Sequence, residues 1–272
     1  MDLSVGLTGK VAVVTGGGGV LCAQMAKALA SQGARIAVLD INEQAAQGIA
    51  AEIVTAGGDA VGLAANVVNR PSLLAAREAV LTAFGSIDIL INGAGGNSPK
   101  ATTSEERSFF ELAQADMQFV FDLNFFGTVL PTQVFGEVMA AKGAGVVINV
   151  SSMAAFTPLT RTIAYSAAKA AVSNFTQWMA VHFAHHYSSK LRVNAIAPGF
   201  LLTEQNRFLL TDKLTGQLTP RGQKIIDATP AGRFGEADEL IGAVLFLCSD
   251  ASSFISGAVI PIDGAFSAYS GV

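Results

Sequence analysis

The sequence has few charged residues for its length of 272. Only 14% of the residues are charged, and 17 basic residues face 21 acidic ones, which gives a net charge of −4. No run of basic side chains of the kind that binds phosphate backbones is present, so we expect no nucleic-acid partner. Hydrophobic residues make up 51% of the chain. This composition excludes intrinsic disorder and is sufficient for a large buried core.

Long apolar runs and cysteines are also scarce. The longest uncharged stretches, such as 11–26, are interrupted by glycine and threonine, whereas a membrane-spanning helix needs about 20 mainly apolar residues. The first four residues lack the basic start and apolar run of a secretory signal. The two cysteines, Cys22 and Cys248, match neither a metal-binding spacing nor a disulfide framework. We therefore expect a cytoplasmic protein with no membrane partner, in which Cys22 is a small packing residue.

Short apolar runs alternate with helical patterns along the whole chain. The expected strands are 10–15, 35–40, 60–65, 87–92, 145–150, 191–197 and 258–262, and helices are expected at 20–33, at 42–57 and from Pro71 onward. Continuous apolar strands separated by helices indicate a parallel sheet that is covered on both faces. The sequence therefore predicts an α/β fold: a single domain spanning 1–272, with a doubly wound (Rossmann) seven-stranded parallel sheet.

Two polar segments interrupt this alternation. One spans 97–115 and is rich in threonine, serine and glutamate, and the other spans 203–235. Both follow predicted strands at the carboxyl edge of the sheet, where ligands bind in open α/β sheets. Because long loops in compact domains are usually functional, we expect both insertions to form walls of a substrate site rather than ordinary surface loops.

A glycine-rich turn follows the first predicted strand. The segment Thr15-Gly16-Gly17-Gly18-Gly19 opens the first helix, where glycines let the backbone approach a pyrophosphate and helix amides can bind it. Asp40 ends the second strand, 24 residues after Gly16. A carboxylate there can accept hydrogen bonds from the adenosine ribose and would repel a 2′-phosphate, and no basic residue follows at 41–43. NAD(H) is therefore the expected cofactor, although Asp40 could also cap the next helix.

A tyrosine and a lysine at helical spacing suggest acid/base chemistry. Tyr165 and Lys169 are four residues apart, so they share one helix face. A neighbouring ammonium favours the phenolate and would bring the pKa of Tyr165 closer to neutrality. Ser152 lies 13 residues before Tyr165, directly after the strand expected at 145–150. The strand order would place its hydroxyl near the start of the tyrosine helix.

Together, these motifs resemble the short-chain dehydrogenase/reductase family over the whole chain. The residues that carry the resemblance are Thr15-Gly16 with the glycine run, Asn92-Gly93-Ala94-Gly95, Asn124, Ser152, Tyr165 with Lys169, and Pro198-Gly199 with Thr203. The resemblance implies that Tyr165 is the general acid/base and that Ser152 orients the carbonyl. It also implies that Lys169 holds the nicotinamide ribose, that Asn124 positions a water, and that Thr203 contacts the carboxamide.

The sequence departs from the family pattern at the cofactor end. Glycines are usual four and six residues after Gly16, where this chain has Val20 and Cys22, and Gly93 stands where a second asparagine is typical. Asn66 replaces an acidic residue that often contacts adenine. The expected cofactor-binding residues are Thr15, Gly16, Gly17, Gly18, Gly19, Val20, Asp40, Asn66, Val67, Asn92, Gly93, Ala94, Tyr165, Lys169, Pro198, Gly199 and Thr203.

A finer resemblance concerns the substrate. Segments 97–103, 121–135, 151–178, 197–207 and 266–272 are similar to the subgroup that acts as D-mannonate oxidoreductase, also called D-fructuronate reductase. A sugar acid needs a cation for its carboxylate and polar groups for its hydroxyls. The candidate substrate residues are Asn97, Lys100, Met153, Arg161, Glu204, Asn206 and Arg207. The resemblance also implies a homotetramer.

Other functions remain open at this point. Within the enzyme class, a gluconate 5-dehydrogenase-like or a 3-oxoacyl-thioester reductase activity is the alternative, and a non-catalytic nucleotide sensor is a third hypothesis. His182, His185 and His186 lie at helical spacings without a nearby carboxylate or cysteine, so we interpret them as structural and expect no metal.

Overall fold

The structure, a computed structural model, contains one seven-stranded parallel sheet and describes residues 6–203, 207–212 and 215–271. The strand order is β3-β2-β1-β4-β5-β6-β7. The strands are β1 (Val11–Thr15), β2 (Arg35–Asp40), β3 (Asp59–Ala64), β4 (Ile89–Asn92), β5 (Gly145–Val150), β6 (Leu191–Pro198) and β7 (Val259–Ile262). The predicted doubly wound α/β fold is confirmed, with strand ends within two residues of those expected.

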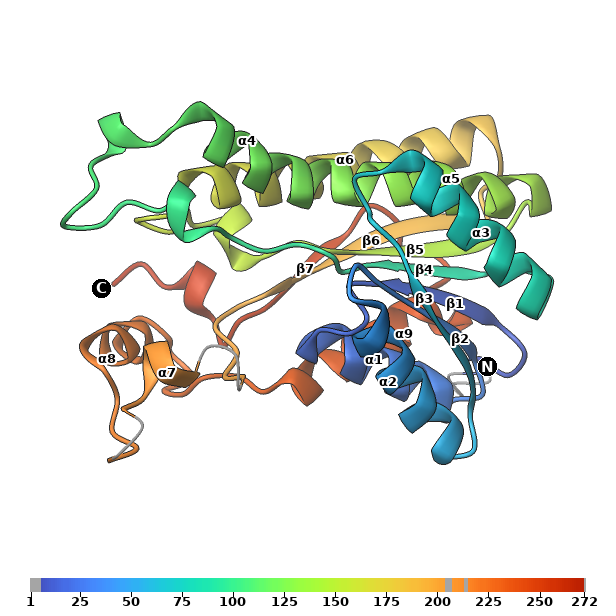
Figure 1. Cartoon of the computed structure of the whole chain (residues 1–272), viewed down its shortest axis with the longest axis horizontal. Helices are drawn as coiled ribbons and strands as arrows, with labels where there is room; N and C mark the ends of the chain where they lie inside the picture. Colours follow the sequence, from blue (N-terminus) through green and yellow to red (C-terminus); the bar gives the residue numbers. More distant parts are fainter. Residues whose placement is uncertain (1–5, 204–206, 213–214, 272) are drawn as a thin grey trace.

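Helices cover both faces of this sheet. Figure 1 shows α3, α5 and α6 on one face and α1, α2 and α9 on the other. The helices are α1 (Val20–Ser31), α2 (Glu43–Thr55), α3 (Arg70–Phe84), α4 (Gln114–Phe121), α5 (Gly127–Lys142), α6 (Ile163–His186), α7 (Arg207–Leu210), α8 (Pro220–Asp227) and α9 (Ile241–Cys248). A π-helical turn, Asp122–Phe126, joins α4 to α5. Among the described residues, no helix is long and apolar enough to cross a bilayer.

Each face of the sheet has its own apolar core. Successive side chains of a strand point to opposite faces. Val11 and Val13 therefore pack with residues of α3, α5 and α6, while Ala12 and Val14 pack with residues of α1, α2 and α9. This two-sided burial explains why the strands are continuous apolar runs rather than alternating ones.

Local sequence signals set where the helices begin. The Asn42 side chain accepts a hydrogen bond from the backbone N–H of Ala45 and caps α2. Asn69 caps α3 in the same way, with Pro71 in the first turn as predicted. The alternative role of Asp40 as a helix cap is wrong, because Asn42 occupies that position.

The chain reverses direction across the sheet between β1 and β4, which are neighbours although β2 and β3 separate them in sequence. Ligands bind outside the carboxyl ends of the strands at such a switch point. Both polar insertions leave the sheet at this edge. The first contains two short 3-10 turns, Pro99–Ala101 and Phe109–Glu111. The second contains α7 and α8, and its two ends are joined by the backbone hydrogen bond from Leu202 to Gly235.

Candidate active site

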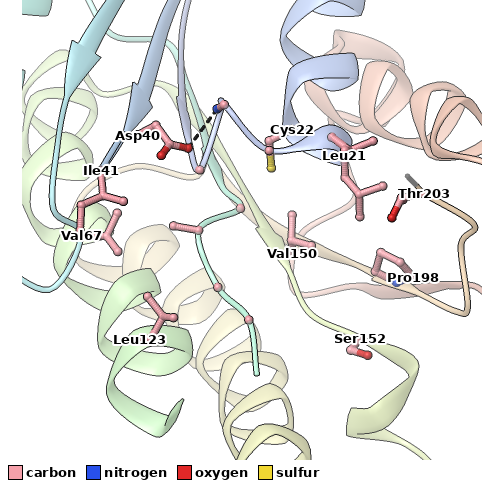
Figure 2. A pocket seen from close by; sticks show the side chains of 18 of the residues that line it. Leu21, Cys22, Asp40, Ile41, Val67, Leu123, Val150, Ser152, Pro198 and Thr203 are labelled. Carbon is pink, nitrogen blue, oxygen red and sulfur yellow. Dashed lines mark hydrogen bonds between the residues drawn. The ribbon is translucent and has the colours of Figure 1, made fainter. Parts of the chain in front are cut away.

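A cavity of about 680 Å³ opens at this edge of the sheet. Its walls come from the turns that follow the strands β1 to β6, from α1 and α6, and from the π-helical turn. Figure 2 shows Asp40 near one end of the cavity and Ser152 near the other. The volume falls in the ordinary range for pockets that take a small molecule or a cofactor.

The glycine turn brings backbone against backbone at the base of the cavity. Gly16 has a φ of +65°, and a Cβ built there would lie 2.8 Å from the Cα of Ala94. A Cβ at Gly18 would lie 2.7 Å from the Cβ of Ala45 and 3.1 Å from Oδ2 of Asp40. Side chains at these positions would force the turn away from its neighbours. The glycines therefore form a cradle that fits a pyrophosphate beside the first amides of α1.

Asp40 is fixed by two backbone donors. Its Oδ2 accepts a hydrogen bond from the N–H of Gly18 at 3.0 Å, drawn as the dashed line in Figure 2, and its Oδ1 accepts one from the N–H of Asn42 at 2.9 Å. Each carboxylate oxygen keeps a second lone pair for a ligand hydroxyl. Among the described residues that line the cavity, Lys169 at the other end is the one cation, so nothing near Asp40 would compensate a 2′-phosphate.

Three predicted cofactor residues lie behind the cavity wall instead of on it. The Thr15 hydroxyl accepts hydrogen bonds from the N–H groups of Gly93 and Ala94, at 3.1 and 3.3 Å. Asn92 donates to Thr132 and Asn149, both at 2.9 Å. Gly17 donates to the carbonyl of Leu39. These residues hold the turns in place and do not contact the cavity.

The remaining predicted cofactor residues do line the cavity. They are Gly16, Gly18, Gly19, Val20, Asp40, Asn66, Val67, Gly93, Ala94, Tyr165, Lys169, Pro198, Gly199 and Thr203. They come from five strand ends and two helices, so the fold, and not local sequence, brings them together.

Ser152, Tyr165 and Lys169 lie at the same end of the cavity. The Lys169 ammonium donates to the carbonyl oxygen of Val150 at 2.7 Å and lies 5.7 Å from the centroid of the Tyr165 ring. Burial lowers the pKa of Lys169 to about 8. Burial also raises the pKa of Tyr165, while a hydrogen bond with Ser152 acts in the opposite direction.

The expected lowering of the Tyr165 pKa by Lys169 is therefore wrong for this structure. The ammonium points at Val150, and the desolvation of the phenol exceeds the effects that favour the phenolate. The phenol is accordingly held protonated, which is the form that can donate a proton.

Asn124 lies in the π-helical turn and clamps a loop that borders the cavity. Its Oδ1 accepts from the N–H of Gly96 at 3.1 Å, and its Nδ2 donates to the carbonyls of Gly96 and Val120, both at 2.7 Å. A Cβ built at Gly95 would lie 2.7 Å from Asn124 Oδ1 and 3.3 Å from Lys169 Nζ. Asn124 and Lys169 thus flank Gly95, and the missing side chain lets them approach each other.

The predicted substrate residues are placed differently. Asn97, Lys100, Arg161 and Arg207 are exposed, Met153 is buried, and none of these five lines the cavity. Glu204 and Asn206 lie outside the described residues. The first insertion is nevertheless attached to the segment before Tyr165, because the N–H of Thr103 donates to the carbonyl of Arg161 at 3.0 Å.

Comparisons with known proteins identify the family. The family model described as enoyl-(acyl carrier protein) reductase matches residues 20–267. A crystal structure from Haemophilus influenzae, described as a proposed D-mannonate oxidoreductase with bound NAD, is 49% identical and covers 100% of both chains, with a TM-score of 0.93. The chain belongs to the short-chain dehydrogenase/reductase family. It is therefore an oxidoreductase.

Two further relatives of this short-chain dehydrogenase/reductase show the range of the matches. An uncharacterized oxidoreductase of Bacillus subtilis, UxuB, is 47% identical over 100% of both chains. A crystal structure of a proposed gluconate dehydrogenase from Agrobacterium tumefaciens is 29% identical, with a TM-score of 0.87 and coverage of 98% of this chain and 100% of that one.

The cavity of this short-chain dehydrogenase/reductase also contains residues that sequence reasoning missed. They are Leu21, Cys22, Ile41, Asn42, Ala45, Ala65, Gly95, Gly96, Leu123, Val150, Ser151, Phe200 and Leu201. Most of them directly adjoin a predicted residue, so extending each motif by one or two positions would have found them. Cys22 carried a clearer signal, because it departs from the family's glycine pattern.

Proposed function

We propose that the protein is an NAD(H)-dependent oxidoreductase that interconverts the alcohol and ketone of a sugar acid, namely D-mannonate and D-fructuronate. One observation supports this chemistry most strongly. A single cavity has Asp40 at one end and Ser152, Tyr165 and Lys169 at the other. The sugar-acid substrate is supported by the description of the Haemophilus influenzae relative.

NAD(H) is favoured over NADP(H) by the surroundings of Asp40. The carboxylate is oriented by Gly18 and Asn42 with lone pairs to spare, so it can accept both hydroxyls of the adenosine ribose. Its charge would repel a 2′-phosphate. The relative with 49% identity was crystallised with NAD, which agrees with this assignment.

The bound nicotinamide would supply or accept the hydride at the reacting carbon. In the direction of reduction, Tyr165 donates its phenolic proton to the ketone oxygen, which then becomes the alcohol hydroxyl. Ser152 hydrogen-bonds the same oxygen and orients the carbonyl. Lys169 would hold the nicotinamide ribose from its place beside the carbonyl of Val150. Asn124 holds the loop beside Lys169 and positions the water that links the lysine to solvent.

The substrate carboxylate would be bound away from these groups. In D-fructuronate the reacting ketone is C2 and the carboxylate is C6, so a cation several ångströms from Tyr165 must bind it. Arg161 lies four residues before Tyr165, and Lys100 and Arg207 lie on the two insertions. The link between Thr103 and Arg161 brings the first insertion to the segment that carries Arg161. All three cations remain candidates.

A gluconate dehydrogenase-like activity is the second candidate, supported by the relative from Agrobacterium tumefaciens. A reductase of 3-oxoacyl thioesters is the third, because family members of this fold act on acyl chains. A nucleotide sensor without catalysis is disfavoured, since it would have no use for Ser152, Tyr165 and Lys169 around one point.

A substrate panel tests the proposal. NADH oxidation is followed with hexuronates, ketogluconates and acyl thioesters at equal concentrations, and D-fructuronate should give the highest kcat/KM. If an acyl thioester is reduced and D-fructuronate is ignored, the sugar-acid assignment fails while the reductase assignment stands.

The proposal includes a homotetramer. Four apolar side chains are exposed on α4 (Phe119), on the π-helical turn (Phe126) and on α6 (Trp178 and Val181), and Phe254 is fully exposed shortly before β7. Exposed apolar side chains gathered on two separate parts of a surface support self-association. Light scattering should give about 112 kDa, four times the 28.0 kDa of one chain. A mass of one chain at micromolar concentration would contradict the tetramer.

A further inference from the structure

The loop Gly93-Ala94-Gly95-Gly96 forms part of the cavity wall but has almost no side chains of its own. Glycine-rich segments lose much conformational entropy on folding, so such a loop needs contacts from outside to keep one conformation. Thr15 holds its first two N–H groups, and Asn124 holds Gly96. In each of these contacts a side-chain oxygen accepts from a backbone N–H of the loop. Neither fills the space beside Gly93.

Cys22 occupies that space. A Cβ built at Gly93 would fall inside the van der Waals shell of the Cys22 sulfur, whereas it would lie 3.6 Å from the Cys22 Cβ, at ordinary contact distance. The Cys22 side chain is 4% exposed, and the residue lines the cavity. In Figure 2 it lies in the first turn of α1, on the cavity side. The Cys22 sulfur and a side chain at position 93 therefore cannot occupy this space together.

We propose that Cys22 is a positioning residue for the cofactor and that it forms one interlocking pair with Gly93. The thiol fills the volume that a side chain at position 93 would take, and so presses the glycine loop into place from the α1 side. The two departures from the family pattern then belong together: the cysteine at position 22 fills the space left by the glycine at position 93. The same loop carries Gly95, which Asn124 and Lys169 flank, so a shift at Gly93 would reach the catalytic end.

A volume-conserving exchange tests the pair. Gly93→Ala adds a methyl group that collides with the sulfur, and Cys22→Ala removes the sulfur. In the double variant the new methyl lies close to where the sulfur was, and the one tight contact left is with the Thr15 carbonyl oxygen, 3.0 Å from the built Cβ. The matched control is Cys248→Ala, because Cys248 is as well buried, at 6% exposure, but lies in α9 and does not line the cavity. The measurements are the Kd for NADH, by fluorescence titration, and the melting temperature.

Gly93→Ala should weaken NADH binding about tenfold or more, because overpacking shifts the backbone and this backbone belongs to the loop that lines the cavity. The double variant should bind NADH at least about threefold more tightly than Gly93→Ala, which is the signature of coupled neighbours. Cys22→Ala and Cys248→Ala should both lower the melting temperature, but only Cys22→Ala should raise the Kd for NADH.

Two results would overturn the proposal. One is a double variant that binds no better than Gly93→Ala. The other is an unchanged Kd for NADH in Cys22→Ala, which would make Cys22 an ordinary core residue. If Gly93→Ala does not fold, the Kd values of Cys22→Ala and Cys248→Ala for NADH still show whether Cys22 positions the cofactor. The inference rests on NAD(H) occupying this cavity, and the titration of the wild-type protein tests that condition separately.

Discussion

The cofactor end of the cavity and the two candidate substrate insertions are built differently. At the cofactor end, Gly16 and Gly18 bring backbone against backbone, and Asp40 is held by two N–H groups. On and near the insertions, the candidate cations Lys100, Arg161 and Arg207 are exposed and lie outside the cavity lining. The comparison teaches that the fold itself builds the cofactor end, whereas in the proposed function side chains on the two insertions would select the substrate. Changes in the two regions should therefore have separable effects.

The largest effect is expected at the end of the cavity that holds Ser152, Tyr165 and Lys169. Tyr165→Phe removes the proposed proton donor and keeps the ring, so turnover should fall by about 10²–10⁴-fold, the usual contribution of a general acid. The Kd for NADH should change far less than turnover, because phenylalanine keeps the ring that lines the cavity. Steady-state kinetics and NADH titration measure the two quantities. Near-wild-type turnover would refute the mechanism.

A smaller effect on kcat/KM is expected from replacing the candidate substrate cations on and near the insertions. Replacing the cation that binds the carboxylate by methionine should lower kcat/KM for D-fructuronate about ten- to a hundredfold, the equivalent of about 1.5–3 kcal/mol for a charge-assisted hydrogen bond. Lys100, Arg161 and Arg207 are replaced one at a time, and the uncharged ketose D-fructose is the control substrate. The correct variant should lose much less activity on D-fructose. Equal losses on both substrates in all three variants would mean that none of these cations binds the carboxylate.

Lys169 links catalysis to stability through its burial. Its pKa is about 8 in the folded chain against an ordinary value of 10.5. Between these values the unfolded chain binds more protons than the folded one, so stability rises with pH. From pH 7 to 9.5, the wild type should gain about 2 kcal/mol of unfolding free energy relative to Lys169→Met. Urea unfolding of both proteins across this range measures the difference. A constant difference would show that the pKa is not lowered.

The smallest effect is expected from removing only a charge at the cofactor end. Asp40→Asn keeps an acceptor for the Gly18 N–H but removes the repulsion of a 2′-phosphate, so the preference for NADH over NADPH should fall about tenfold. Asp40→Ala should in addition weaken NADH binding, because it also removes the ribose acceptor. The kcat/KM values with both cofactors give the preference. A wild-type enzyme that already prefers NADPH would contradict the role of Asp40.

The sequence predicted the cofactor end better than the substrate end for a physical reason. Strand periodicity, the glycine turn and Asp40 are local signals, and the parallel sheet necessarily brings the strand ends to one edge. Thr15, Gly17 and Asn92 were assigned to the cofactor because they belong to these motifs, yet they act from behind the wall through hydrogen bonds that no local pattern reveals.

Packing and burial account for the other differences between the sequence-based predictions and the structure. The spacing of Tyr165 and Lys169 placed them on one face, but only the structure shows that desolvation dominates the pKa of Tyr165. The role of Cys22 also depends on a contact with Gly93, 71 positions along the chain. No property of either residue in isolation predicts this contact. The substrate residues stay predictions, since exposed side chains on insertions leave no periodic signal in the sequence.

The central claim is that one cavity couples an NAD(H) site to a sugar-acid site, and the selectivity of the wild-type enzyme for a carboxylated ketose tests it most directly. Initial rates of NADH oxidation are measured with D-fructuronate and with D-fructose under identical conditions. The account predicts a kcat/KM for D-fructuronate that is about ten- to a hundredfold higher, since only that substrate offers a carboxylate to the cations on the insertions. Equal values for the two ketoses, or no reduction of D-fructuronate, would contradict it.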